Sequence, residues 1–203
     1  MNLTSTLSKE YGDLWRSCQV RPQRLPEVDG IVERMVQHKK RYTAAGKAVG
    51  VPWHVVAVIH MLEGSGSFST HLHNGDPLTA RTVHVPKGRP SAGRPPFTWE
   101  VSASDALVFD GLSRWTNWSL SGTLFVLERF NGFGYRKKEI NIHSPYLWSF
   151  SNHYTKGKFI GDNVFSATAI SAQCGAAVLL NRMVSHRLVK IDGAAATGGV
   201  PNP

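Results

Sequence analysis

The sequence is poor in cysteine and has no long hydrophobic run. Among its 203 residues only Cys18 and Cys174 are cysteines, which excludes a disulfide scaffold and a CxxC metal or redox motif. We expect both to be buried free thiols, although they could pair in an oxidising compartment. No stretch approaches the roughly 18 apolar residues of a transmembrane helix, so we expect no stable membrane insertion. No apolar segment follows a basic start, so we also expect no secretory signal peptide.

Acidic residues are scarce relative to basic ones. The chain has 14 acidic and 23 basic residues, a formal net charge of +9 and a pI of about 9.8. This balance favours a polyanionic partner such as nucleic acid, an anionic membrane or the bacterial envelope, unless the charge has no partner at all. The basic runs at residues 39–41 and 136–138 are too short for a nucleic-acid arm, and no nucleic-acid-binding signature is present. We therefore expect no nucleic-acid partner.

The chain shows no internal repeat and no linker in its middle. Its composition, 41% hydrophobic and 18% charged, is that of a globular protein. We predict one domain over residues 1–192 and a monomeric protein. The last segment, residues 193–203, has small residues and almost no large apolar ones, which indicates a flexible tail.

Apolar spacing predicts mainly helices. The most distinctive begins at Val51 and Pro52, ends at Glu63 and Gly64, and is apolar on most sides, as a buried helix would be. Other helices are expected over residues 27–45, over residues 102–115, from Ser119 or Ser121 through residue 130, and over residues 166–189.

One β-hairpin is expected directly after the buried helix. Residues 67–85 contain several strand-forming residues around the turn sequence Asn74-Gly75-Asp76. Residues 86–96 (PKGRPSAGRPP) are too rich in proline and glycine for regular structure. We therefore predict an α+β domain, mostly helical, with one small antiparallel sheet beside the buried helix.

Glu63 is a candidate general acid. A carboxyl group at the end of a buried helix is expected to lose water, which raises its pKa, and the negative end of the helix dipole acts in the same direction. A protonated carboxyl group near neutral pH is the proton donor that glycosidic cleavage needs. The alternative is an ordinary exposed glutamate at a helix end.

Asp76 and Thr82 lie on the predicted hairpin and could face Glu63 across a cleft. A second carboxylate at this place can activate a water molecule or stabilise an oxocarbenium-like transition state, and a threonine hydroxyl can help to hold that water. The alternatives are a turn aspartate and an ordinary strand threonine.

The order Glu63, Asp76, Thr82 resembles the Glu/Asp/Thr triad of phage-type lysozymes. The spacing from Asp76 to Thr82 matches that family, whereas the gap from Glu63 to Asp76 is longer than in the family. Much of residues 50–180 is also similar to phage and prophage endolysin-like proteins, in the blocks VPWHVVAVIHMLEGSGSF, THLHNGDPLTARTVHVPKGRP, PPFTWE, LERFNGFGY and SPYLWSFSNHYTKGKF. The resemblance implies a lysozyme-like fold, the three residues as the catalytic set, and no cofactor.

Aromatic and amide residues gather in residues 130–154 and suggest a sugar-binding groove. Sugars offer apolar ring faces and hydroxyl edges, which suit such side chains. The run FNGFGY loosely resembles a loop that flanks the sugar in goose-type lysozymes and transglycosylases. Trp148 and Phe150 are expected in the core. The candidate substrate-binding residues are Asn131, Tyr135, Tyr146, Asn152 and Tyr154.

Histidines offer a metal-dependent alternative. His71, His73, Asp76 and His84 could in principle form a zinc site, which would indicate an amidase or peptidase. The chain has no HExxH motif, and the His-x-His pair and Asp76 fall across the predicted turn, so we predict no metal. His60 is expected to be a core residue or to support Glu63 indirectly.

These features predict a muramidase that hydrolyses the β-1,4 bond between N-acetylmuramic acid and N-acetylglucosamine in peptidoglycan. The alternatives are a lytic transglycosylase on the same fold, a non-catalytic wall-binding module, and a chitinase or chitosanase. Arg89 or Arg94 of the proline-rich loop is a candidate partner for stem-peptide carboxylates. Without a signal peptide, the protein would be made in the cytoplasm and reach the wall by holin-type release or on a phage particle.

Overall fold

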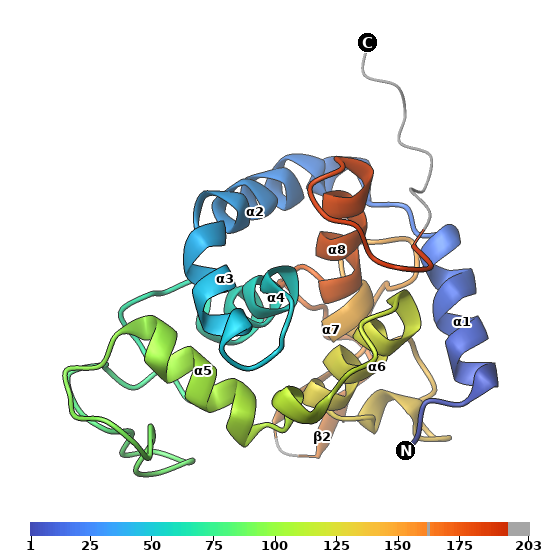
Figure 1. Ribbon diagram of the computed structural model, residues 1–203. Coiled ribbons are helices and arrows are strands. Elements are labelled where there is room, and N and C mark those ends of the chain that lie inside the picture. Colours follow the sequence, from blue (N-terminus) through green and yellow to red (C-terminus); the bar gives the residue numbers. More distant parts are fainter. Residues whose placement is uncertain (162, 195–203) are drawn as a thin grey trace. The chain divides into compact units, whose positions relative to one another are not determined.

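The computed structural model describes residues 1–161 and 163–194. The chain folds into two compact units (Figure 1). The first unit combines Met1–Val32 with Asn117–Pro203, and the second is Glu33–Thr116. Helix α2, Leu25–Gln37, runs across the boundary between them.

The first unit begins with helix α1, Ser5–Arg16, which the sequence analysis did not predict. The Thr4 hydroxyl caps it by accepting a hydrogen bond from the Leu7 N–H (3.2 Å). Leu7, Tyr11 and Trp15 recur every four residues and are all buried, so one face of the helix enters the core. This helix packs against α6, Leu120–Asn131.

The rest of the first unit is built around α6 and two further helices. Helix α6 begins after Ser119, whose hydroxyl accepts from the Gly122 N–H, so Ser119 and not Ser121 is the cap among the two candidates that the sequence offered. It packs against α7, Pro145–Trp148, and α8, Ala176–Ser185, which also pack on each other. The 3₁₀ turn η1, Pro22–Arg24, lies between α1 and α2, and η3, Gly134–Arg136, lies between α6 and α7.

A buried carboxylate links α1 and α6. Glu128 is 1% exposed, and its two oxygens accept hydrogen bonds from Arg136 Nε and Nη2, both at 2.8 Å. The Tyr11 hydroxyl donates to the same carboxylate, and Arg136 also pairs with Glu10. Because the charge is paired and hydrogen-bonded, the core can hold it without the penalty of an isolated ion.

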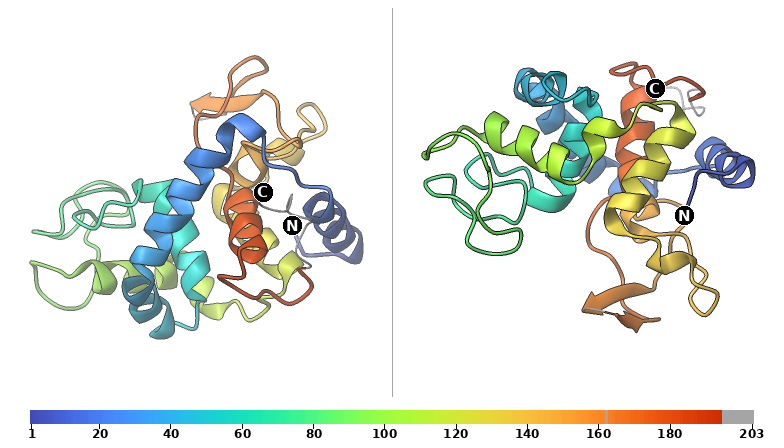
Figure 2. Two further views of the ribbon diagram at one scale, coloured as in Figure 1. Left: turned by 90° about the horizontal axis from the view of Figure 1, so that it is seen from above. Right: turned by 60° about the horizontal axis from the view of Figure 1, so that its bottom comes forward.

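The β-sheet of the described residues lies in the first unit. Strands β1, Lys158–Gly161, and β2, Val164–Ser166, are antiparallel, with Phe159 opposite Phe165. Figure 2 shows them as a hairpin that projects from the helices of this unit. Helices account for about 48% of the described residues, which confirms a mostly helical α+β protein with one small antiparallel sheet.

The second unit contains helices α3, Lys39–Lys47, α4, Trp53–Gly64, and α5, Trp99–Phe109, with the 3₁₀ turn η2, Leu112–Arg114. Helix α3 packs against both α4 and α5. Eight of the twelve residues of α4 are buried, as predicted for a helix that is covered on most sides.

Four predicted elements differ from the structure. The helix expected over residues 102–115 is α5, which begins after the cap residue Thr98 and ends at Phe109, so Ser102 lies inside it and is not its start. The helix expected over residues 27–45 is two helices, α2 and α3, separated at His38. The helix expected over residues 166–189 is confined to α8, because strand β2 and a loop take its first part. The hairpin expected over residues 67–85 is wrong: this segment consists of turns, with a single isolated bridge between Thr70 and Pro77.

The remaining predictions concern thiols, membranes and the tail. Cys18 and Cys174 are buried free thiols, as expected, and burial raises the pKa of Cys18 to about 12. Within the described residues, no helix is both long enough and apolar enough to cross a membrane. The predicted flexible tail, residues 193–203, lies outside the described residues from residue 195 onward.

Candidate functional site

Glu63 is the next-to-last residue of helix α4. The helix begins after Pro52 and ends at Ser65, whose left-handed backbone (φ 50°) turns the chain away. Leu62 is buried beneath this end, whereas Glu63 is exposed. The expectation that the protein itself buries this carboxyl group is therefore wrong. Any loss of water at Glu63 has to come from what binds there.

His60 holds the loop that follows Glu63. Its Nε2 atom lies 2.8 Å from the carbonyl oxygen of Ser67, which can only accept, so Nε2 carries the proton and donates. The other ring nitrogen, Nδ1, then accepts from the Tyr42 hydroxyl at 3.0 Å. Burial lowers the pKa of His60 to about 4, so the ring is neutral near pH 7. His60 is thus a core residue that supports the end of α4.

Phe68 closes this loop over an aromatic cluster. Its ring contacts those of His60 and Trp99, with centroids 4.6 and 4.8 Å away, and the Arg41 guanidinium lies 4.0 Å above it. Arg41 is in turn paired with Glu100 on α5. The backbone around Glu63 is therefore fixed by packing from both α3 and α5.

Asp76 is buried and accepts four hydrogen bonds. Its Oδ2 accepts from the N–H groups of Val83 (2.7 Å) and His84 (3.0 Å) and from the Asn74 amide (3.1 Å). Its Oδ1 pairs with His84 Nδ1 at 2.6 Å. The His84 side chain and N–H hold the pKa of Asp76 well below its usual range. Asp76 is therefore an ionised anchor of the loop.

Thr82 is also buried, and its hydroxyl holds the same loop together. It donates to the carbonyl oxygen of Pro86 (2.5 Å) and accepts from the Arg89 N–H (2.8 Å). The Thr82 backbone bonds Arg89 and Gly88. Both hairpin candidates thus make hydrogen bonds within residues 74–89, where no hairpin forms.

The histidines of the zinc alternative each have a protein partner. His71 bonds Ser102 and the carbonyl oxygen of Ala80, at 2.7 and 2.8 Å, and His73 bonds Asp105 at 2.8 Å. Among the described residues, no group of three or more His, Cys, Asp or Glu side chains is placed to hold a metal ion. Arg89, a candidate for stem-peptide carboxylates, makes a bidentate pair with Asp105 at 2.8 Å on both bonds.

In the first unit, two of the candidate sugar-binding tyrosines support the β-hairpin. Tyr135 is buried, and its hydroxyl accepts from the Phe159 N–H at 3.2 Å. Tyr154 is buried too: its hydroxyl donates to the Gly157 carbonyl oxygen (3.1 Å) and accepts from the Ser171 N–H (3.0 Å). Both hydroxyl groups therefore have hydrogen-bond partners within the protein, so a structural role accounts for these two tyrosines without a ligand.

The other three candidate sugar-binding residues are dispersed in the first unit. Asn131 is exposed at the last position of α6, and Tyr146 is buried in α7. The Asn152 side chain accepts from the Gln19 N–H (2.9 Å) and donates to the Ser17 carbonyl oxygen (3.0 Å). Trp148 and Phe150 are buried, as predicted.

A pocket in the first unit contains residues that the sequence analysis missed. Tyr154 lines it, together with Arg21 and Arg24. The available signal was weak: two arginines three residues apart around a proline-initiated turn, Arg21-Pro22-Gln23-Arg24.

No protein-family model, curated protein or solved structure matches the chain significantly.

Proposed function

We propose that the protein is a muramidase with a lysozyme-like fold, which cleaves the β-1,4 bond between N-acetylmuramic acid and N-acetylglucosamine. Glu63 is its general acid. The observation that carries the proposal is an exposed carboxylate at the end of a helix that is otherwise buried, beside a loop fixed by His60. The net charge of +9 suits the anionic bacterial wall.

In the proposed reaction, a glycan strand covers Glu63 and removes water from it. Loss of water favours the protonated carboxyl group, which donates its proton to the glycosidic oxygen as the bond breaks. The positive charge that develops on the sugar needs a nearby anion or a nucleophile. In the hydrolytic version, Asp76 with Thr82 positions the water that attacks the sugar.

The hydrogen bonds of Asp76 favour a second candidate, a lytic transglycosylase. Both oxygens of Asp76 already accept hydrogen bonds, and a carboxylate with a lowered pKa is a poor base for activating water. A transglycosylase needs the acid but no attacking water, because the sugar closes on itself to give a 1,6-anhydro product. The non-catalytic wall-binding module and a chitinase or chitosanase are the remaining alternatives.

Digestion of purified peptidoglycan tests the proposal. The wild type is expected to release muropeptides, and Glu63→Gln, which has the same shape but no acid proton, is expected to lose nearly all activity. Glu33→Gln removes an exposed glutamate from α2 and serves as the matched control, with activity unchanged. Full activity of Glu63→Gln would overturn the assigned acid, and an inactive wild type that still binds the wall would indicate the binding module.

Mass spectrometry of the products separates the two catalytic candidates. Hydrolysis adds one water to each broken bond and leaves reducing ends, whereas transglycosylation leaves 1,6-anhydro ends that are lighter by one water. We expect reducing ends. Exclusive anhydro ends would replace the muramidase by the transglycosylase and leave Glu63 as the acid.

A further inference from the structure

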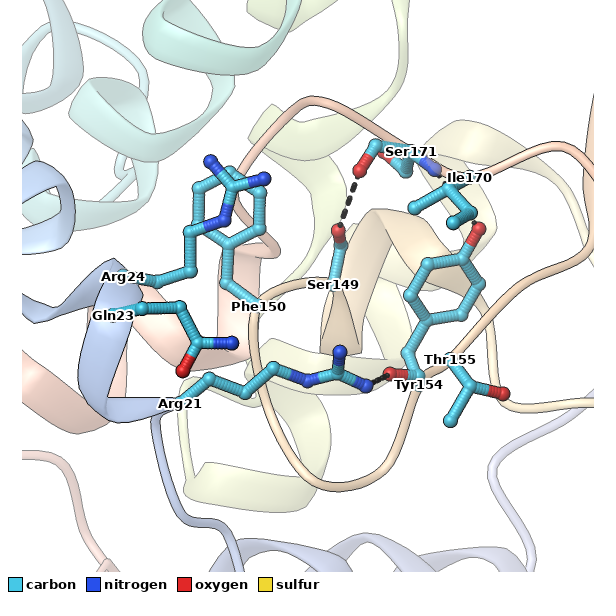
Figure 3. Close-up of a pocket in the computed structure, with 9 residues that line it drawn as sticks. All are labelled: Arg21, Gln23, Arg24, Ser149, Phe150, Tyr154, Thr155, Ile170 and Ser171. Carbon is cyan, nitrogen blue, oxygen red and sulfur yellow. Dashed lines mark hydrogen bonds between the residues drawn. The ribbon is translucent and has the colours of Figure 1, made fainter.

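The first unit contains a cavity of about 330 Å³, within the range of about 300–1,000 Å³ that is typical of small-ligand sites. Figure 3 shows the side chains around it. They come from the turn η1, from the segment after α7 and from the loop before α8.

The wall of this pocket is fixed by bonds between distant segments. Arg21 donates from its N–H to the Phe150 carbonyl oxygen (2.9 Å), and its guanidinium donates to the carbonyl oxygens of Ser151 and Tyr154. Phe150 is held with φ at 75°, a left-handed conformation that is rare for a bulky residue. A strained residue persists only where its surroundings determine it, as they do at many ligand sites.

The charge of the pocket is positive. Two of its nine lining residues are arginines and none is acidic. The Arg24 guanidinium lies 4.3 Å above the Phe150 ring, which holds it over the pocket wall (Figure 3). Among the described residues, only its Nη1 atom donates to a protein acceptor, Glu27 at 2.7 Å, so further N–H groups remain for a ligand.

The geometry points to a binding site for the carboxylate of a short peptide. We propose that Arg24 binds the carboxylate, with the exposed side chains of Gln23 and Thr155 available to its polar groups. Ile170, which is 64% exposed, offers an apolar surface at the rim for a small aliphatic side chain. The planar guanidinium fork matches a carboxylate.

A carboxylate fits this pocket better than a phosphate group does. The carboxylate of Glu27 already pairs with the Arg24 guanidinium, so this guanidinium is placed to bind a carboxylate. The negative charge of Glu27 also repels a doubly charged phosphate more strongly than a singly charged carboxylate. Arg21 contributes charge but already uses its guanidinium to hold the wall.

This inference rests on the proposed function where it names a source of the peptide: the stem peptide of peptidoglycan, which ends in a free carboxylate. The site would then add a peptide contact to glycan binding. The binding itself is a property of the pocket and does not depend on Glu63.

Titration of the full chain with a synthetic stem tetrapeptide, followed by calorimetry or NMR shifts, tests the proposal. The free-acid peptide is expected to bind at least about tenfold more tightly than its C-terminal amide, since a charge-assisted hydrogen bond contributes at least that much. Inorganic phosphate is expected to compete only weakly. Equal binding of acid and amide, no binding at millimolar peptide, or tighter binding of phosphate would each overturn it.

Arg24→Gln is expected to weaken binding of the free-acid peptide about tenfold and to leave binding of the amide unchanged. Arg16→Gln is the matched control, because Arg16 is also an exposed arginine of the first unit with a carboxylate partner three residues away, Asp13. Circular dichroism verifies that both variants are folded. Equal peptide binding by Arg24→Gln and Arg16→Gln would reject the site.

Glu63→Gln separates this proposal from the enzymatic one. It should bind the peptide as the wild type does, while losing peptidoglycan cleavage. A wild type that binds the free-acid peptide but does not cleave the wall would retain the pocket and reject the enzyme. A wild type that cleaves the wall but does not bind the peptide would reject the pocket and retain the enzyme.

Discussion

Single side chains decide how the loop after α4 is held. Asp76 places one negative charge where two backbone N–H groups, an amide and an imidazole converge. Such a cluster stabilises the ionised carboxylate and is stabilised by it in return. The charge of Asp76 should therefore control the order of residues 74–84.

Asp76→Asn is expected to loosen this loop, because a neutral amide accepts more weakly from the N–H groups of Val83 and His84. The native pKa of Asp76 lies below the usual value of 3.8. Its charge therefore contributes fully to the stability of the folded protein above pH 3.8, and this stabilisation is lost as the pH falls further. Hydrogen exchange of these two amides should be faster in the variant at pH 6. Equal protection in both proteins would contradict the role of the charge.

Residue identity alone predicted part of this site. The sequence indicated correctly that Glu63 ends a buried helix, because Pro52 and Gly64 mark its limits. It did not indicate that Glu63 is exposed, since that depends on what packs around the helix end. The hydrogen bonds of Asp76 and Thr82 were equally hidden, because their partners, such as His84 and Pro86, are set by the path of the loop.

At the scale of elements, helix α4 buries two histidines. His54 and His60 are 8% and 0% exposed, and burial lowers the pKa of each to about 4. In the unfolded chain a histidine takes up its proton near pH 6.5. Each therefore contributes to stability above pH 6.5, and this contribution is lost progressively as the pH falls toward 4.

The free energy of unfolding is expected to fall by about 2 kcal/mol for each of these histidines between about pH 7 and pH 5. Urea unfolding at both pH values measures the loss. His54→Phe should have a smaller pH dependence than the wild type, because one titrating group is gone, whatever its effect on stability at pH 7. A wild type as stable at pH 5 as at pH 7 would contradict the burial of two neutral rings.

Close packing of α3 on α4 depends on Gly46. A Cβ atom there would lie 2.2 Å from the carbonyl oxygen of Val51 and 3.1 Å from Val56 Cγ2. Gly46→Ala is therefore expected to lower the free energy of unfolding by about 1–3 kcal/mol or more. Gly12→Ala in α1 meets only the flexible end of Arg16 at 3.3 Å, and should raise it by up to about 1 kcal/mol through helix propensity. Urea unfolding measures the change in the free energy of unfolding for each variant. Changes of the same sign in both variants would refute the packing argument.

Helices with clear residues at their limits were predicted best. Helices α4 and α6 lie where the sequence placed them, with Ser119 as the cap of α6. Residues 67–85 were misassigned because their strand-forming residues make local side-chain bonds to backbone carbonyl oxygens, His71 to Ala80 and Thr82 to Pro86, in place of a strand ladder. The predicted helix over residues 166–189 was too long, because Ser166 pairs with Lys158 in the sheet, a contact between strands that helical spacing does not reveal, and α8 begins only at Ala176.

For the whole molecule, the feature that acts over the longest range is the net charge of +9. Long-range attraction of this kind raises association with a polyanion and is screened by salt, with a Debye length of about 30 Å at 0.01 M and about 8 Å at 0.15 M. Contacts between a neutral sugar and a binding groove depend little on ionic strength. The two contributions to wall binding are therefore separable.

Binding of Glu63→Gln to purified peptidoglycan is expected to weaken at least several-fold when salt is raised from about 10 mM to about 150 mM, because the attraction to wall carboxylates and phosphates is screened. The inactive variant is used so that cleavage does not remove the binding sites. Binding to an uncharged chitin oligosaccharide, measured under the same two conditions, should change little. If both ligands respond equally, or if neither does, the positive charge of the chain does not direct it to the wall.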